Sequence, residues 1–335
     1  MTSEGKKKIV FVANPISGTH NKRLILKKVD ELLDRDRYDF EVVTTEYAGH
    51  ATEIARSAAN SGVDIVCAIG GDGTVNETAR ALVHTDTALA IIPCGSGNGL
   101  ARHLSIPMDP TRAIRLINEG PVQRIDYGIV NFHPFFCTCG VGFDAEVSQR
   151  FAEANKRGPI SYVEQVLKTY RTFNPETYEL TVEDEQSGTQ TYEAVIIACA
   201  NASQYGNNVY IAPQASVQDG LMDVTIIQPF PLIDVTQIAF QLINGTLSDS
   251  SYIKTLRCKQ LTIRRKKAGV IHCDGDPFDA EALIDVSIVP QGMSCIFSSE
   301  ARNRNVGNTL SNAFLEAFSN ITQRYQELLQ MNPLK

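Results

Sequence analysis

The feature that most constrains the fold is the alternation of short apolar runs with helix-like segments in the first third of the chain. Two runs, 63–69 and 88–92, are continuously apolar, which is typical of strands buried on both faces of a parallel sheet. Similar runs at 8–13 and 38–44 bring the expected strands to four. Strands that alternate with helices predict a doubly wound parallel α/β domain. Helices are expected up to residue 33 and at 51–59, 74–83 and 98–104.

From about residue 128 the pattern changes to short strands separated by turn-forming pairs such as Asp219-Gly220. Only two helical segments interrupt them, near 160–170 and 232–244. This pattern of short strands and turns predicts an antiparallel β-sandwich as the second domain. The expected strands are 177–183, 192–200, 222–228, 260–265, 269–273 and 283–289.

The last part of the chain, after residue 302, has apolar residues at three- and four-residue spacing, which predicts a helix. This helix either packs on the body of the protein or contacts a membrane or a second copy of the chain in a homodimer. We therefore expect one domain formed by 1–127 with 300–335, and another formed by 128–299. The apolar positions are Leu310, Phe314, Phe318, Ile321, Tyr325 and Leu328.

Composition excludes some classes of protein. The 335 residues carry a net charge of −7, which argues against a general nucleic-acid binder. No run approaches the ~18 apolar residues of a transmembrane helix. The eight cysteines include no CxxC pair, so we expect buried free thiols and a cytoplasmic protein. The histidines, His272 among them, show no metal-ligand spacing and are interpreted as structural or surface residues.

Three loops of small residues follow expected strands, at 14–18, 70–76 and 95–99. Ligands of an open parallel sheet bind beyond the carboxyl ends of its strands, and glycines there let backbone N–H groups approach a phosphate. Thr74 and Glu77 have the spacing of a helix capping box. None of the loops matches GxxxxGK[ST] or GxGxxG, so neither a P-loop nor a Rossmann dehydrogenase is supported.

Asp72 is the acidic residue inside these loops. A carboxylate beside phosphates is repulsive unless it binds a metal ion or accepts a proton. Asp72 is therefore a candidate for Mg²⁺ coordination or base catalysis.

These loops and the motifs that follow resemble the catalytic domain of the diacylglycerol kinases, a group that includes sphingosine and ceramide kinases and soluble bacterial lipid kinases. The resemblance covers roughly residues 8–300 and implies a two-domain fold related to NAD kinase and phosphofructokinase. The motifs that carry it are Asn14–Gly18, Thr45-x-x-x-Gly49-His50-Ala51, Gly70–Asn76, Pro93-x-Gly95-Ser96-Gly97-Asn98, Arg124-Ile-Asp126, Gly140–Ala145, Ala212–Gly220 and Asp274-Gly-Asp276.

The resemblance also implies roles for particular residues. Asp276 falls on the position of the family's proton acceptor, with Asp72 and Asp274 as alternatives. Ser216, Asp219 and Leu221 match a structural Mg²⁺ site. The implied ATP contacts are Asn14, Pro15, Ser17, Gly18, Thr45, Gly70, Gly71, Asp72, Gly73, Thr74, Asn76, Gly95, Ser96 and Asn98.

Two residues depart from the family pattern. Asp276 stands where the family usually has Glu, which shortens the carboxylate's reach by one methylene. Gly99 stands where many bacterial members have Asp, so a carboxylate of the metal network is missing and Asp126 is a candidate to supply part of it.

The expected activity is ATP- and Mg²⁺-dependent phosphorylation of a lipid hydroxyl, on diacylglycerol, a sphingoid base or a related long-chain alcohol, at a membrane surface. The basic run 264–267 is either a solvated edge or a patch that attracts anionic membrane. One alternative is a kinase for a soluble substrate such as NAD. Another is a catalytically weak nucleotide-binding protein associated with membranes.

Overall fold

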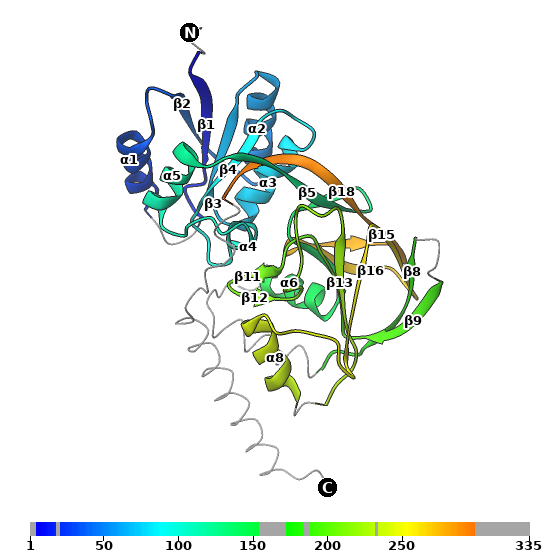
Figure 1. The fold of residues 1–335 in the computed structure, drawn as a ribbon. Coiled ribbons are helices and arrows are strands. Elements are labelled where there is room, and N and C mark those ends of the chain that lie inside the picture. The colour runs from blue at the N-terminus through cyan, green and yellow to red at the C-terminus, as the bar shows by residue number, and fades with distance from the viewer. Residues whose placement is uncertain (1–4, 18–20, 154–171, 184–187, 232–233, 299–335) are drawn as a thin grey trace.

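The structure is a computed structural model that describes residues 5–17, 21–153, 172–183, 188–231 and 234–298 (Figure 1). The helices expected near 160–170 and after 302, and Gly18 of the first loop, lie outside the described residues. The division into 1–127 with 300–335 and 128–299 stays a prediction. Residue 127 itself lies inside a strand that continues to Val130.

The first third of the chain forms the predicted α/β domain. Its parallel strands have the order β2-β1-β3-β4, with bounds Lys7–Ala13 (β1), Tyr38–Thr44 (β2), Ile65–Gly70 (β3) and Ala88–Pro93 (β4). Every residue of β3 and β4 is buried, as continuous apolar runs predict for central strands. The helices are Lys22–Leu32 (α1), His50–Asn60 (α2), Asp72–Leu82 (α3), Gly99–His103 (α4) and Pro110–Glu119 (α5).

The helices cover the sheet with one apolar face each. In α2, Ala51, Ala55 and Ala58 recur at three- and four-residue spacing and are buried. The start of α5 is fixed by the Asp109 side chain, which accepts a hydrogen bond from the backbone N–H of Arg112, and by Pro110 in the first turn.

The second half forms the predicted antiparallel sandwich. One layer has the order β14-β13-β10-β7-β16-β17. Its strands are Thr138–Gly142 (β7), Ile196–Ala200 (β10), Met222–Ile227 (β13), Ile253–Cys258 (β14), Gly269–Cys273 (β16) and Asp276–Ala280 (β17). A small pair, Gln204–Gly206 (β11) with Val209–Tyr210 (β12), and helices Phe143–Glu153 (α6) and Val235–Asn244 (α8) complete this half.

The other layer is an extension of the parallel sheet beyond β4. The order continues as β18-β15-β8-β9, and β5 pairs with both β18 and β6. A core of buried side chains from both layers, including Phe135, Tyr178 and Ile271, fills the sandwich. The bounds are Val122–Val130 (β5), His133–Phe135 (β6), Glu176–Val182 (β8), Thr189–Ala194 (β9), Gln260–Arg265 (β15) and Leu283–Ile296 (β18).

Strand β18 joins the two halves of the molecule. Its first residues pair with β15 in the sandwich, and Ser294 and Cys295 pair in parallel with β4. Figure 1 shows β18 and β5 running together from one half to the other. β18 was expected only as far as residue 289, and the expected strand 192–200 is two strands, because at Val195 the chain passes from one sandwich layer to the other.

The cysteine prediction is confirmed: all eight are free and buried. Among the described residues, no helix is both long and apolar enough to cross a membrane.

Candidate active site

Two of the three predicted loops touch at the carboxyl edge of the parallel sheet. Gly71 follows β3 and Gly95 follows β4, and the backbones approach so closely that a Cβ on Gly95 would lie 2.7 Å from the Cα of Gly71. Gly73, the second residue of α3, has open space around its Cα. Small residues are therefore required where the loops meet, and the first turn of α3 faces open space.

The first loop is tied to the same helix. The side-chain amide of Asn14 donates a hydrogen bond to Thr74 Oγ1 at 3.1 Å. The expected capping box of Thr74 and Glu77 is wrong, because α3 begins earlier, with Gly71 as an N-cap that has no side-chain hydrogen bond. Glu77 instead accepts from the backbone N–H of Ala51 at the start of α2. The first-turn N–H groups of α3 thus have no side-chain cap.

Asp72 connects the second and third loops. Its carboxylate accepts hydrogen bonds from the backbone N–H groups of Asn98 at 2.8 Å and Gly99 at 2.6 Å. Asn98 has a left-handed backbone (φ 51°), and its side chain bonds both the N–H and the carbonyl of Gly95. Asp72 therefore holds the third loop in place, besides any role toward a ligand.

Gly99, where the resemblance led us to expect Asp, packs tightly against the second half of the chain. A Cβ on Gly99 would lie 3.2 Å from the carbonyl oxygen of Tyr205 and 3.3 Å from Cys137 Sγ. Tyr205 belongs to β11 of the second half, whose Gly206 also packs directly on Gly97. The third loop is thus closed against the second half of the chain, and residue 99 has no room for a carboxylate.

Asp274 holds the two halves together at the site. It lies in the turn between β16 and β17 and accepts hydrogen bonds from the backbone N–H groups of Phe136, Cys137 and Thr138 at 2.7–3.0 Å. The side-chain amide of Asn76 on α3 is its fourth donor, at 2.5 Å. Two donors on each oxygen fill the acceptor capacity of the carboxylate. This arrangement suits a structural role better than proton transfer.

Asp276, two residues further on, is exposed at the start of β17. The surrounding protein desolvates its carboxyl group and raises its pKa above the ordinary value. The nearby charge of Arg80 acts in the opposite direction, whereas Glu77 and Asp72 raise the pKa further. These three neighbours lie on α3, so Asp276 faces the helix that begins at the GGDGTVN loop.

A buried trio beside this turn was missed by sequence reasoning. The Asp144 carboxylate, in the first turn of α6, accepts from the Tyr205 hydroxyl at 2.9 Å and contacts His272 Nε2 at 3.0 Å. His272 is 1% exposed and lies two residues before Asp274. Asp144 belongs to the motif at 140–145. Nothing in the sequence spacing of Asp144, Tyr205 and His272 indicates that their side chains meet.

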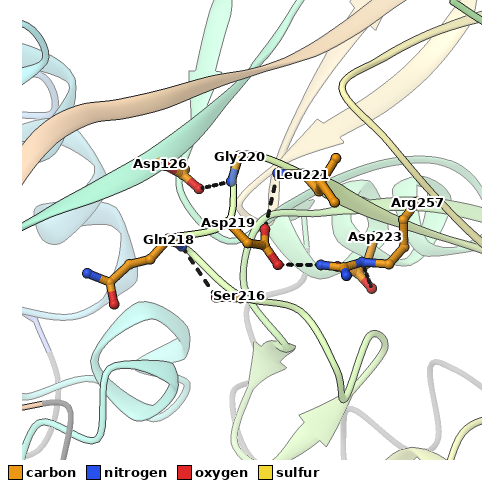
Figure 2. A network of polar contacts seen from close by, with 8 residues as sticks. All are labelled: Asp126, Ser216, Gln218, Asp219, Gly220, Leu221, Asp223 and Arg257. Atoms are coloured by element: carbon orange, nitrogen blue, oxygen red, sulfur yellow. Dashed lines mark hydrogen bonds and ion pairs between the residues drawn. The ribbon is translucent and has the colours of Figure 1, made fainter. Parts of the chain in front are cut away.

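The four expected metal ligands form a group on β5 and the neighbouring 216–221 loop, and Figure 2 shows its contacts. Asp126 is fully buried, and its carboxylate accepts from the backbone N–H groups of Gly220 and Gln291, both at 2.7 Å. Asp219 forms an ion pair with Arg257 and accepts from the N–H of Leu221. Ser216 Oγ accepts from the N–H of Gln218 at 3.4 Å. Asp126 is therefore a structural hydrogen-bond acceptor, and Arg257 occupies the cation position beside Asp219.

The site fits a phosphate-bearing nucleotide better than a metal ion held by protein alone. The paired glycines and the open first turn of α3 supply backbone N–H groups for phosphate. Among the described residues, no three His, Cys, Asp or Glu side chains form a metal-binding cluster. Mg²⁺ that arrives with phosphates needs only one or two protein carboxylates, and Asp72 and Asp276 are the candidates.

The remaining predicted ATP contacts lie at or beside the same edge. Thr45 follows β2 and donates its backbone N–H to Ala13 at the end of β1. Ser17 in the first loop donates its hydroxyl to the carbonyl of Asn14. Pro15 and Ser96 are exposed, and Gly70 packs against Thr74.

A parallel α/β domain whose loop-bearing strand ends face a β-sandwich is the architecture of a two-domain kinase. The relatives agree: residues 8–130 match the diacylglycerol kinase catalytic domain, and residues 137–297 match the YegS C-terminal NAD kinase beta sandwich-like domain. The chain therefore has a diacylglycerol kinase catalytic domain followed by a YegS-type C-terminal domain, and this pair of domains points to a lipid kinase.

Individual relatives are similar along most of the chain. A probable lipid kinase YegS-like from Chromohalobacter salexigens is 28% identical, over 75% of this chain and 83% of its own length. The diacylglycerol kinase of Bacillus subtilis is 26% identical, over 81% and 90%. A crystal structure of a diacylglycerol kinase from Bacillus anthracis superposes with a TM-score of 0.71 at 20% identity, covering 88% of this chain and 98% of that one. That structure supports the fold.

Proposed function

We propose that this protein transfers the γ-phosphoryl group of ATP to a hydroxyl of a membrane lipid, with Asp276 as proton acceptor. The observation that carries the proposal is the hydrogen bond between Asn76 and Asp274. It joins the helix that begins at the phosphate loop to the turn that presents Asp276. A nucleotide phosphate bound at the start of α3 would thus lie close to a lipid hydroxyl bound beside Asp276.

The chain's residues have distinct roles in this proposal. Backbone N–H groups at the start of α3 and at the Gly95 loop bind phosphate oxygens. Asp72 keeps the third loop in register with α3 through its bonds to Asn98 and Gly99. Asp276 accepts the proton of the attacking hydroxyl, while Asp274 fixes the turn that positions it. Mg²⁺, when bound with ATP, offsets charge on the transferring phosphoryl group.

The acceptor must reach the site from a membrane surface, which the protein would contact peripherally from the cytoplasmic side. The basic run 264–267 contributes less to this contact than the sequence suggested. The guanidinium of Arg265 is buried and donates to the carbonyls of Gly269, Val270 and Ala280. Arg264 pairs with Glu179, so Lys266 and Lys267 are the cations of the run free to attract anionic lipid.

The test is transfer of radiolabelled phosphate from ATP to a panel of lipid alcohols in mixed micelles, with NAD as the soluble acceptor. The panel contains diacylglycerol, monoacylglycerol, phosphatidylglycerol, sphinganine and ceramide. We expect a labelled lipid product with at least one of them, and none with Asp276→Asn. Labelling of NAD alone would identify a soluble-substrate kinase. ATP binding without transfer to any acceptor would contradict the proposed activity.

A further inference from the structure

Residues 216–221, which the resemblance implies hold a structural Mg²⁺, have a protein cation, Arg257, paired with the carboxylate of Asp219. We infer that the guanidinium of Arg257 takes the place of the divalent cation there, so that the loop is held without metal. The site is the network drawn in Figure 2. It lies away from the phosphate loops, so the inference is independent of the proposed kinase activity.

The position of Arg257 follows from strand register. Arg257 on β14 is the direct cross-strand partner of Asp223 on β13. Side chains directly opposite each other in an antiparallel pair have Cβ atoms about 5 Å apart, close enough for an ion pair. Arg257 Nε lies 3.3 Å from the Asp223 carboxylate, and its Nη2 contacts Asp219 Oδ2. One planar guanidinium thus bridges two carboxylates, a geometry for which arginine is suited.

The bridge uses the carboxylate that a metal ion would need. One oxygen of Asp219 faces Arg257, and the other accepts the N–H of Leu221 at 3.1 Å. An arginine guanidinium is always charged in a folded protein, so it remains a cation beside both carboxylates. A divalent ion entering here would have to displace this cation or sit beside it against charge repulsion.

The loop held by Arg257 also connects to the centre of the molecule. Gly220, between Asp219 and Leu221, donates its N–H to the buried carboxylate of Asp126. Gly220 has a left-handed backbone (φ 69°), which fixes the direction of the turn. Holding Asp219 therefore holds the contact between this loop and β5. A structural metal ion would otherwise hold the loop against β5 in the same way.

The experiment measures thermal unfolding by circular dichroism without nucleotide, in EDTA and in millimolar MgCl₂ or CaCl₂. We expect the Tm of the wild-type protein to be the same in all three. Arg257→Met should lower the Tm in EDTA by about 2–4 °C, because two carboxylates lose their cation. Either cation should then raise the Tm of this variant, since Asp219 and Asp223 are free to bind it.

Arg264→Met is the matched control, because Arg264 is also an exposed strand arginine paired with one carboxylate, Glu179. Its Tm should not respond to the cations. A second variant, Arg257→Met with Asp219→Asn, should lose the recovery. The inference is overturned if the cations raise the wild-type Tm and Asp219→Asn abolishes that rise. It is equally overturned if they stabilise Arg257→Met no more than Arg264→Met.

Discussion

At the scale of single residues, Asp276, the expected proton acceptor, and Asp274, one of its alternatives, have different environments in the structure. Asp274 has four hydrogen-bond donors around it, whereas Asp276 is exposed beside charged groups of α3. A proton acceptor needs a free lone pair and a pKa nearer the working pH than an ordinary Asp provides. Asp276 meets both conditions.

The first prediction follows from the raised pKa of Asp276. Only the ionised carboxylate accepts a proton, so kcat/KM should rise with pH through this pKa and then level off. Because the surrounding protein desolvates this carboxyl group and raises its pKa, the rise should lie at a higher pH than for an Asp in a free peptide. Asp276→Asn should lower kcat by roughly 10²–10⁴-fold, whereas Asp276→Glu should keep the rise and measurable activity. Unchanged activity in Asp276→Asn would exclude it as the base.

A second prediction concerns Gly99. Asp at this position would place its Cβ against the carbonyl of Tyr205 and the thiol of Cys137. Overpacking and an unpaired carboxylate should cost about 2 kcal/mol or more of folding free energy. Thermal unfolding of Gly99→Asp should show a Tm several degrees lower. Gly73→Ala, where open space surrounds the Cα, should leave Tm unchanged or raise it. Equal Tm values for both variants would contradict this packing argument.

At the scale of elements, the sequence predicted strands and loops well where the signal is local. The apolar runs at 63–69 and 88–92 and the glycines that follow them predicted strands β3 and β4 and the loops at their carboxyl ends. Strand β14 was missed because its sequence, IKTLRC, mixes charged and apolar residues without a clear period. Arg257 was therefore not connected with Asp219. Such pairs depend on the register between strands that are distant in the sequence. A single sequence does not reveal that register.

The strands also determine how the cysteines react. Cys67, Cys139, Cys199, Cys273 and Cys295 lie in strands, and burial raises the pKa of the thiols of Cys67, Cys139, Cys273 and Cys295. A thiol reacts as its thiolate, so native protein should react slowly with a disulfide reagent. All eight thiols should react rapidly in denaturant. Rapid labelling of several thiols in the native protein would show that these strands open readily.

At the scale of the whole molecule, one continuous sheet connects the parallel α/β half to the β-sandwich half, and the candidate site lies where the two halves meet. The sequence indicated a change of texture near residue 128, but β5 runs through this point and pairs with β18. β18 in turn pairs with β4 of the parallel sheet and with β15 of the sandwich. The turn carrying Asp276 belongs to the other sandwich layer, between β16 and β17, and the bond between Asn76 and Asp274 ties this turn to α3.

The last prediction tests this coupling through Asp126, which bonds the 216–221 loop and Gln291 of β18 from its place in β5. Asp126→Ala leaves two backbone N–H groups without their acceptor, at a cost of about 2–4 kcal/mol. Calorimetry should show one cooperative transition for the wild-type protein and a Tm lower by roughly 3–6 °C in the variant. Asp285→Ala is the control, because this exposed β18 residue bonds only Thr262 through its side chain among the described residues, and it should change Tm little. Two separate wild-type transitions would mean that the shared sheet does not couple the two halves.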